Sequence, residues 1–273
     1  MDATLIVLGH GTELNAGSAV PVNQHVAELR RRNLFGRVEA AFWKQAPQIK
    51  AVLARTTARR VFIAPLFISE GYFSSVVIPR ELGFDYPDRL QLVKNNSTRF
   101  YCRPVGSHES MTKVILARAA SVVAMFPFPR GPKPSEITLF IAGHGTDRSP
   151  ESRKSVDGQV EMIRALHRYA DVHAVFMEEA PRIGDCYGLS ATKNVVVVPF
   201  FISDGLHTVE DIPVLLGEAP ALVKKRVAAG QPAWRNPTNI KGKLVWYATA
   251  VGTEPLMAEV ILERVREAAG RRA

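Results

Sequence analysis

Two histidines and a glutamate in the second half of the chain stand where a metal or a proton could be handled. His144 lies in a Gly-His-Gly-Thr turn, and Glu178 and His207 each come shortly after a later apolar run. Side chains just beyond the carboxyl ends of parallel strands meet at one edge of a sheet. Two imidazoles and a carboxylate suit Co²⁺, Fe²⁺, Ni²⁺ or Zn²⁺, and they also form a set of general bases. We therefore predict that all three are metal-ligating and catalytic.

The Gly-His-Gly-Thr turn also has a second interpretation. Glycines permit a tight turn and a close ligand approach, and the following helix presents free N–H groups to an anion. An unrelated α/β enzyme could use such a turn to bind a phosphate or a nucleotide. The chain contains neither the GxGxxG nor the GxxxxGK[ST] pattern, which weakens this alternative without removing it.

Each of the three residues has a counterpart 134 residues earlier: His10, Lys44 and Phe73. Lysine brings a positive charge and phenylalanine offers no lone pair, so the first set is a poor metal site. The sequence therefore predicts one working site, in the second half, and a degenerate equivalent in the first.

The counterparts belong to an internal repeat, which is sought before anything else in an unknown sequence. Four blocks recur at the 134-residue offset, including Pro65–Gly71 at Pro199–Gly205. Later blocks, such as Val114–Leu116 and Val260–Leu262, differ by 146 residues, so the second half carries twelve extra residues. We assign them to an insertion around residues 217–243. We predict domains over 1–126 and 136–273, joined by a Pro-rich linker over 127–135.

Each half alternates predicted strands and helices. Short apolar runs are typical of strands buried on both faces, and apolar residues at i, i+4 and i+7 indicate helices. The order βαβαβαβα favours a parallel sheet covered by helices. The fold class is α/β: two similar domains, each a parallel sheet flanked by helices, related by internal duplication. The predicted strands cover 4–8, 38–42, 61–67, 100–104, 137–142, 172–176, 195–201 and 244–248, and the principal helices cover 15–32, 47–55 and 109–124.

Composition limits the function classes. The chain has 273 residues, 47% of them hydrophobic, with a formal net charge of +9. These values exclude disorder and disulfide-rich miniproteins, and a basic balance favours anionic partners. No zinc finger or RNA-binding signature is present, no apolar run approaches a membrane span, and the two cysteines form no CxxC pair. We expect a cytoplasmic protein with no nucleic-acid or membrane partner, either a monomer or a homodimer.

Three motifs of the second half resemble the sirohydrochlorin cobaltochelatase and ferrochelatase family, the class II tetrapyrrole chelatases of the CbiX and SirB type, in a long two-domain form. They are Gly143–Thr146 with Arg148 and Arg153, Phe176–Glu178, and Gly205–Pro213. The first half matches more loosely, over about residues 4–79. The resemblance implies two chelatase-like domains facing one cleft, with the degenerate N-terminal domain acting as a lid or a wall.

The resemblance also implies an activity: insertion of Co²⁺ or Fe²⁺, with Ni²⁺ as a further candidate, into sirohydrochlorin or a related anionic tetrapyrrole. This reaction serves cobalamin or siroheme biosynthesis and makes the enzyme a lyase. The metal is then a substrate, and no organic cofactor is implied. Four basic residues are candidates for contact with the substrate, His10, Arg148, Arg153 and Arg182, because arginine forks match carboxylates bidentately. A non-catalytic tetrapyrrole or metal carrier remains the alternative, kept open by the degenerate first half.

Overall fold

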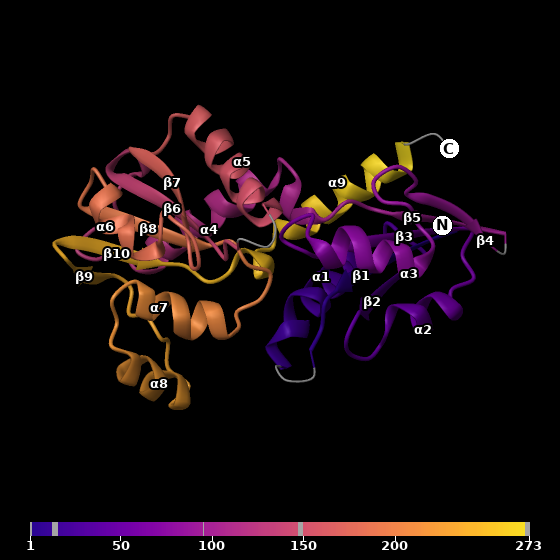
Figure 1. Ribbon diagram of the computed structural model, residues 1–273, viewed down its shortest axis with the longest axis horizontal. Coiled ribbons are helices and arrows are strands. Elements are labelled where there is room, and N and C mark those ends of the chain that lie inside the picture. Colours follow the sequence, from indigo (N-terminus) through magenta and orange to yellow (C-terminus); the bar gives the residue numbers. More distant parts are fainter. Residues whose placement is uncertain (1, 13–15, 95, 147–149, 271–273) are drawn as a thin grey trace. The chain divides into compact units, whose positions relative to one another are not determined.

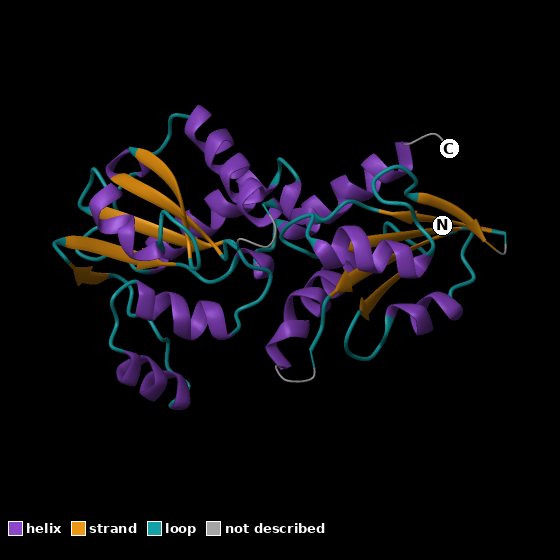
Figure 2. Ribbon diagram, viewed as in Figure 1, coloured by secondary structure: helices purple, strands orange, loops and turns teal. Residues whose placement is uncertain are grey.

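Two compact units make up the chain. The computed structural model describes residues 2–12, 16–94, 96–146 and 150–270. Unit 1 comprises the chain up to Met111 together with the chain from Pro255 onward, and unit 2 comprises Thr112–Glu254. Each unit is built around its own sheet with helices packed against it (Figures 1 and 2).

The sheet of unit 1 has five strands in the order β2-β1-β3-β5-β4. β1, β2, β3 and β5 are parallel, and β4 runs antiparallel to β5. The register places Gly9 beside Phe42, so the chain leaves β1 and β2 at the same edge. The strands are β1 (Ala3–Gly9), β2 (Arg37–Phe42), β3 (Arg60–Pro65), β4 (Gln91–Lys94) and β5 (Ser97–Tyr101).

Unit 2 repeats this topology in the order β7-β6-β8-β10-β9. Gly143 lies beside Phe176, as Gly9 lies beside Phe42. The strands are β6 (Ile137–Gly143), β7 (Asp171–Phe176), β8 (Asn194–Pro199), β9 (Thr238–Ile240) and β10 (Lys243–Tyr247). The predicted fold class is confirmed with one correction: each sheet has an antiparallel edge strand, β4 or β9, because a short hairpin precedes the last parallel strand.

The helices follow the predicted alternation with shorter bounds. The helix expected over 15–32 is an α-helix from Val20, preceded by a 3₁₀ turn over Ala16–Ala19. Those of unit 1 are α1 (Val20–Arg31), α2 (Ile49–Ala54), α3 (Ile78–Leu82) and α9 (Met257–Gly270). Those of unit 2 are α4 (Met111–Met125, from Thr112 onward), α5 (Glu151–Ala165), α6 (Cys186–Leu189), α7 (Ile212–Leu215) and α8 (Pro220–Ala228).

The central strands carry the core. Every residue of β6 is buried, and the four valines Val195–Val198 of β8 are fully shielded from solvent. Each buried valine, leucine or isoleucine contributes about 1.5–3 kcal/mol relative to an exposed one. The rigid sheet therefore fixes the positions of the turns at its carboxyl edge.

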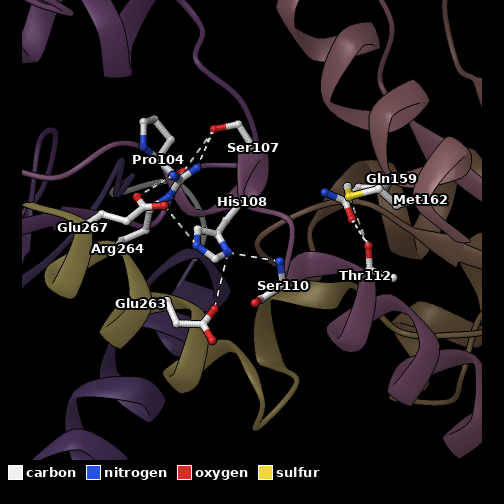
Figure 3. A network of polar contacts seen from close by, with 10 residues as sticks. All are labelled: Pro104, Ser107, His108, Ser110, Thr112, Gln159, Met162, Glu263, Arg264 and Glu267. Carbon is white, nitrogen blue, oxygen red and sulfur yellow. Dashed lines mark hydrogen bonds and ion pairs between the residues drawn. The ribbon is translucent and has the colours of Figure 1, made fainter.

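The last helix of each half belongs to the other half's unit. α9 packs against β3 and β5 of unit 1, although it follows β10 in the chain. Figure 3 shows its anchor: His108 lies between Glu263 and Glu267, at 3.4 and 3.2 Å, and Arg264 Nε donates to the carbonyl oxygen of Pro104 at 2.9 Å. The repeat predicts domains over 1–126 and 136–273, and this stays a prediction about the duplicated segments. The compact units have different boundaries, because α4 belongs to unit 2 and α9 to unit 1.

The insertion predicted over 217–243 contains two elements. β9 has a counterpart in β4 of unit 1, so the range is too wide as an insertion without an equivalent. The element without a counterpart is α8, which packs against α7 and the turn that precedes it. In the described ranges, no helix is long and apolar enough to cross a membrane.

Candidate functional site

The turn after β6 positions His144. Gly145 has φ +67°, and a Cβ there would lie 2.7 Å from the Glu179 side chain, so glycine is required. The His144 carbonyl oxygen accepts hydrogen bonds from the backbone N–H groups of Met177 and Glu178, at 3.0 and 3.1 Å. The backbone thereby ties the turn to the segment after β7 and brings Glu178 beside His144.

The orientation of the His144 ring is set by its own turn. Nδ1 lies 2.8 Å from the carbonyl oxygen of Gly145. A carbonyl oxygen can only accept a hydrogen bond, so Nδ1 carries the proton and Nε2 the lone pair. Metal-binding histidines usually have this arrangement, in which the second nitrogen donates to a carbonyl or carboxylate.

His207 begins a single π-helical turn, His207–Asp211, which runs directly into α7. Such turns are uncommon and are frequent at functional sites. His207 Nδ1 lies 2.7 Å from Asp211 Oδ2, so the carboxylate holds the ring and leaves Nε2 as the lone-pair nitrogen. Buried Thr208 anchors the turn by hydrogen bonds with Gly205.

The structure brings the three predicted ligands together. The rings of His144 and His207 lie 5.0 Å apart between centroids and are nearly perpendicular, at 84°. Glu178 Oε2 lies 3.8 Å from His144 Nδ1, and all three side chains are partly open to solvent. In the part of the chain that the structure describes, no group of three or more His, Cys, Asp or Glu residues has the geometry to hold a metal ion. The three residues are neighbours but do not form a closed coordination cage.

Asp211 is a candidate positioning residue that the sequence interpretation did not single out. It lies inside the quoted Gly205–Pro213 motif, and its signal is the spacing of four residues from His207. On a helical turn that spacing places two side chains on the same face. The hydrogen bond between them makes Asp211 a positioning residue for the imidazole.

The predicted substrate-binding arginines differ in their surroundings. Arg153 is engaged within unit 2: Nη1 donates to Glu179 and to the Ala180 carbonyl oxygen at 3.0 and 2.8 Å, and Nε donates to Asp157 at 3.2 Å. Arg182 is exposed, and its Nη1 reaches the carbonyl oxygen of Met177 at 3.4 Å, which places it beside the candidate site. Arg148 lies outside the described residues.

A cavity of about 410 Å³ adjoins the candidate ligands. Its lining includes Met177 and Glu178, which follow β7, and Val223 and Lys224 of α8. Glu210 and Asp211 also line it, so its charged lining residues are three acids and one lysine, and the remaining lining residues are apolar. The sequence did not predict this cavity, because α8 reaches it only through the folding of the insertion.

The equivalent position in unit 1 keeps the framework and changes the chemistry. His10 Nδ1 lies 2.9 Å from the Gly11 carbonyl oxygen, and the Phe73 ring lies 5.0 Å from the His10 ring at 78°. Lys44 Nζ sits 5.2 Å from the centre of the Phe73 ring. Partial burial lowers the pKa of His10, and the Lys44 charge lowers it further against the Gly11 hydrogen bond.

Comparison with known proteins finds one family model that matches both halves of the chain. The CbiX family model matches residues 4–122 and again residues 138–268. A protein of Halobacterium salinarum named "Probable sirohydrochlorin cobaltochelatase" is 39% identical over 278 residues, which is 97% of this chain and 91% of that protein. The sirohydrochlorin cobaltochelatase of Methanopyrus kandleri is 30% identical over 142 residues, covering 49% of this chain and 98% of that protein.

Among solved structures, a multi-domain protein of Deinococcus radiodurans, described as similar in structure to chelatases and as carrying two additional domains, matches 99% of this chain. The TM-score is 0.79 at 26% identity, and the match spans 56% of that chain. The double family match agrees with the internal repeat, and the Methanopyrus protein corresponds in length to one repeat.

Proposed function

The chain belongs to the CbiX family, and we propose that it is a metal chelatase that inserts cobalt or iron into sirohydrochlorin or a related anionic tetrapyrrole. The observation that carries the proposal is the pair His144 and His207. Their rings lie 5.0 Å apart, and each Nδ1 is committed to an oxygen acceptor, so that both Nε2 lone pairs are available to a divalent cation. The names of the Halobacterium and Methanopyrus relatives support the same reaction.

An open ligand set suits a metal that has to leave. A closed cage of three or four protein ligands is typical of structural metal sites, whereas sites that react keep open positions. Two imidazoles, with Glu178 at the side, bind a Co²⁺ or Fe²⁺ ion and leave positions for the ring nitrogens of the substrate. The metal passes from imidazole to pyrrole nitrogen by ligand exchange. Weak holding is therefore an advantage in this reaction.

The reaction also releases protons. Two pyrrole N–H protons leave the macrocycle when a divalent ion enters, and a base within reach accelerates their removal. Glu178 is the exposed carboxylate of the site, and it takes these protons or supplies an additional metal ligand. An imidazole accepts a proton at Nε2 once its metal has departed. The three residues thus divide ligation and proton transfer among them.

The substrate carries carboxylate arms, so cationic groups near the site bind it. Arg182 is exposed beside Met177 and, of the two candidate arginines that the structure describes, is the better placed to pair with such an arm. Arg153 already pairs with Glu179 and Asp157, so its contribution requires an exchange of partners. Arg148 and His10 complete the proposed substrate-binding set. No organic cofactor enters the proposal, and the metal is a substrate.

The proposed place of the reaction is the cytoplasm, in cobalamin or siroheme biosynthesis. Cys102 and Cys186 are both buried and neither forms a disulfide, as expected for a protein of a reducing compartment. The ligand chemistry alone does not select one metal, because imidazole and carboxylate accept Co²⁺, Fe²⁺ and Ni²⁺ alike.

An anaerobic absorbance assay tests the function. Purified protein is mixed with sirohydrochlorin and Co²⁺ or Fe²⁺, and metal insertion is followed by the change in the visible spectrum. We expect insertion well above the protein-free rate, and its loss in His144→Ala and in His207→Ala. His10→Ala, its counterpart in unit 1, should retain most of the rate at saturating sirohydrochlorin and raise the KM, because His10 is assigned to the ring and not to the metal. A bound-ligand spectrum without acceleration would instead indicate a tetrapyrrole carrier.

A further inference from the structure

The carboxyl edge of the unit 1 sheet differs from the proposed metal site of unit 2 by more than the loss of metal ligands. In unit 2 the carboxyl edge of the sheet carries four acids, Glu178, Glu179, Glu210 and Asp211. The corresponding residues of unit 1, each 134 positions earlier, are Lys44, Gln45, Val76 and Val77. Each of these four acids is replaced and one cation is added, whereas the acid after the third parallel strand is kept, as Asp204 in unit 2 and Glu70 in unit 1. Glu70 accepts hydrogen bonds from Tyr86 and Ser107. A surface so changed repels Co²⁺ or Fe²⁺ and attracts an anion.

The backbone that presents these side chains is unchanged. The carbonyl oxygen of His10 accepts hydrogen bonds from the N–H groups of Trp43 and Lys44, at 3.1 and 2.8 Å. The carbonyl oxygen of His144 accepts the same pair of bonds from the residues after β7. The Lys44 side chain therefore starts from the position in unit 1 that is equivalent to the position of Glu178 in unit 2. In the described ranges no carboxylate pairs with the Lys44 ammonium group, which is exposed.

An aromatic cluster adjoins this ammonium group, whose nitrogen lies 5.2 Å from the centre of the Phe73 ring. Phe73 contacts the rings of His10 and Tyr72, with centroids 5.0 and 5.9 Å apart, and Phe67 lies 6.4 Å from His10. Tyr72 is 64% exposed, so its ring is open to a ligand. Flat π surfaces stack well on other conjugated rings. The combination of an open aromatic surface and an exposed cation that pairs with no carboxylate of the described residues fits a flat, conjugated molecule with carboxylate arms.

We infer that Lys44, Tyr72 and Phe73 form a second binding surface for the carboxylated tetrapyrrole, one that holds the metal-free ring and excludes the metal ion. The ring stacks on the aromatic side chains and a carboxylate arm pairs with Lys44. The inference rests on the proposed function, because that function supplies the tetrapyrrole. It gives unit 1 a task of its own: unit 2 carries the proposed metal ligands and Arg182, and unit 1 adds a surface for the ring.

The test measures binding of sirohydrochlorin to the full chain, anaerobically and with a chelator present so that no metal contributes. We expect Lys44→Glu to raise the dissociation constant by about tenfold or more, since a charge-assisted pair is lost and a repulsion added. Lys94→Glu makes the same charge change at the opposite end of the unit 1 sheet, on β4, and should change the constant less than about twofold. Phe73→Leu keeps an apolar side chain and should weaken binding through loss of the aromatic face.

The outcomes separate this inference from the proposed function. If Lys44→Glu and Lys94→Glu weaken ring binding equally, the effect is one of overall charge and the inference is overturned. A fall in Co²⁺ affinity of Lys44→Glu, measured without the ring, would also overturn it, because the metal ligands lie in unit 2. If the wild-type chain binds no sirohydrochlorin at all, the proposed function itself fails. Thermal unfolding of each variant confirms that the fold is intact.

Discussion

Arg118 and Arg264 make equivalent hydrogen bonds in different units. Arg264, on α9, donates from Nη2 to Ser107 Oγ at 2.8 Å, and Arg118, on α4, donates from Nη2 to Thr253 Oγ1 at 3.1 Å. The two arginines are 146 residues apart in the sequence, and so are the two hydroxyl residues. Each arginine fastens a helix to the turn after the last parallel strand of its unit. The two halves have therefore exchanged their final helices.

The exchange predicts a large effect of Arg264 on stability. Its side chain is buried, and it donates to the Pro104 carbonyl oxygen as well as to Ser107. We expect Arg264→Ala to lower the free energy of unfolding by roughly 2–4 kcal/mol, because buried acceptors lose their partner. Urea unfolding measures this, with the exposed neighbour Arg266→Ala as the control. Equal effects of the two changes would remove Arg264 as the anchor of α9.

The sequence predicted most of this fold because its signals are local. Apolar runs mark the buried strands β1, β3, β6 and β8, and the constant offset of 134 residues exposes the duplication. The exchange of α4 and α9 was not predictable in the same way. A helix's period shows which face is buried but not which sheet buries it, since both sheets offer equivalent surfaces. β4 and β9 were missed because they are short edge strands with little apolar patterning.

The candidate site could likewise be predicted from the sequence only in part. His144, Glu178 and His207 were predictable because parallel strands bring their carboxyl ends to one edge, and the structure has them as neighbours. The α8 wall of the adjoining cavity comes from an insertion whose path no periodicity encodes. The ion pair between Arg153 and Glu179 could not be predicted either, because the two residues lie on different segments of the chain.

Two glycines should respond to alanine in opposite directions. A Cβ at Gly252 would lie 1.8 Å from the carbonyl oxygen of Ile202, a backbone atom that cannot move aside. We expect Gly252→Ala to destabilise the fold by about 3 kcal/mol or more. A methyl group added at Gly158, within α5, would meet nothing within 4 Å, and Gly158→Ala should stabilise by about 0.5–1 kcal/mol. Chemical denaturation of both variants checks the pair; a stabilised Gly252→Ala would show that the turn can shift.

Both thiols should be inert in the native protein. Cys102 and Cys186 are buried and unbridged, and burial raises the pKa of the Cys186 thiol to about 12. The reactive thiolate is therefore scarce at neutral pH, and access is blocked as well. We expect an aromatic disulfide reagent to titrate no thiol rapidly before unfolding and two per chain in denaturant. Rapid reaction in the native state would contradict the burial of these side chains.

The stability of the protein should depend on His10 below neutral pH. Burial, aided by Lys44, lowers the pKa of His10 below the ordinary histidine value of about 6.5. The unfolded chain therefore takes up a proton at a pH where folded His10 still resists it, so acidification favours unfolding. Relative to His10→Gln, the wild type should lose stability as the pH falls below about 6.5 and show no difference in slope above it.

Lys44→Met provides the internal check on this assignment. Removing the neighbouring positive charge should raise the pKa of His10 and reduce the loss of stability on acidification. Urea unfolding between about pH 5 and pH 8 measures all three proteins. An unchanged pH dependence in His10→Gln would assign the acid sensitivity to another group.

Asp211 should control the metal chemistry without touching the metal. Its carboxylate accepts the Nδ1–H of His207 at 2.7 Å, which fixes the ring and strengthens Nε2 as a ligand. Asp211→Asn keeps the shape and removes the charge, and we expect Co²⁺ affinity and the rate of metal insertion to fall about 10–100-fold. The KM for sirohydrochlorin should remain unchanged, because the effect acts on the metal ligand. Glu210→Gln removes the adjacent carboxylate of the same cavity and is the matched control. If both variants weaken Co²⁺ binding equally, the carboxylates act through their summed charge, and Asp211 has no specific part in positioning His207.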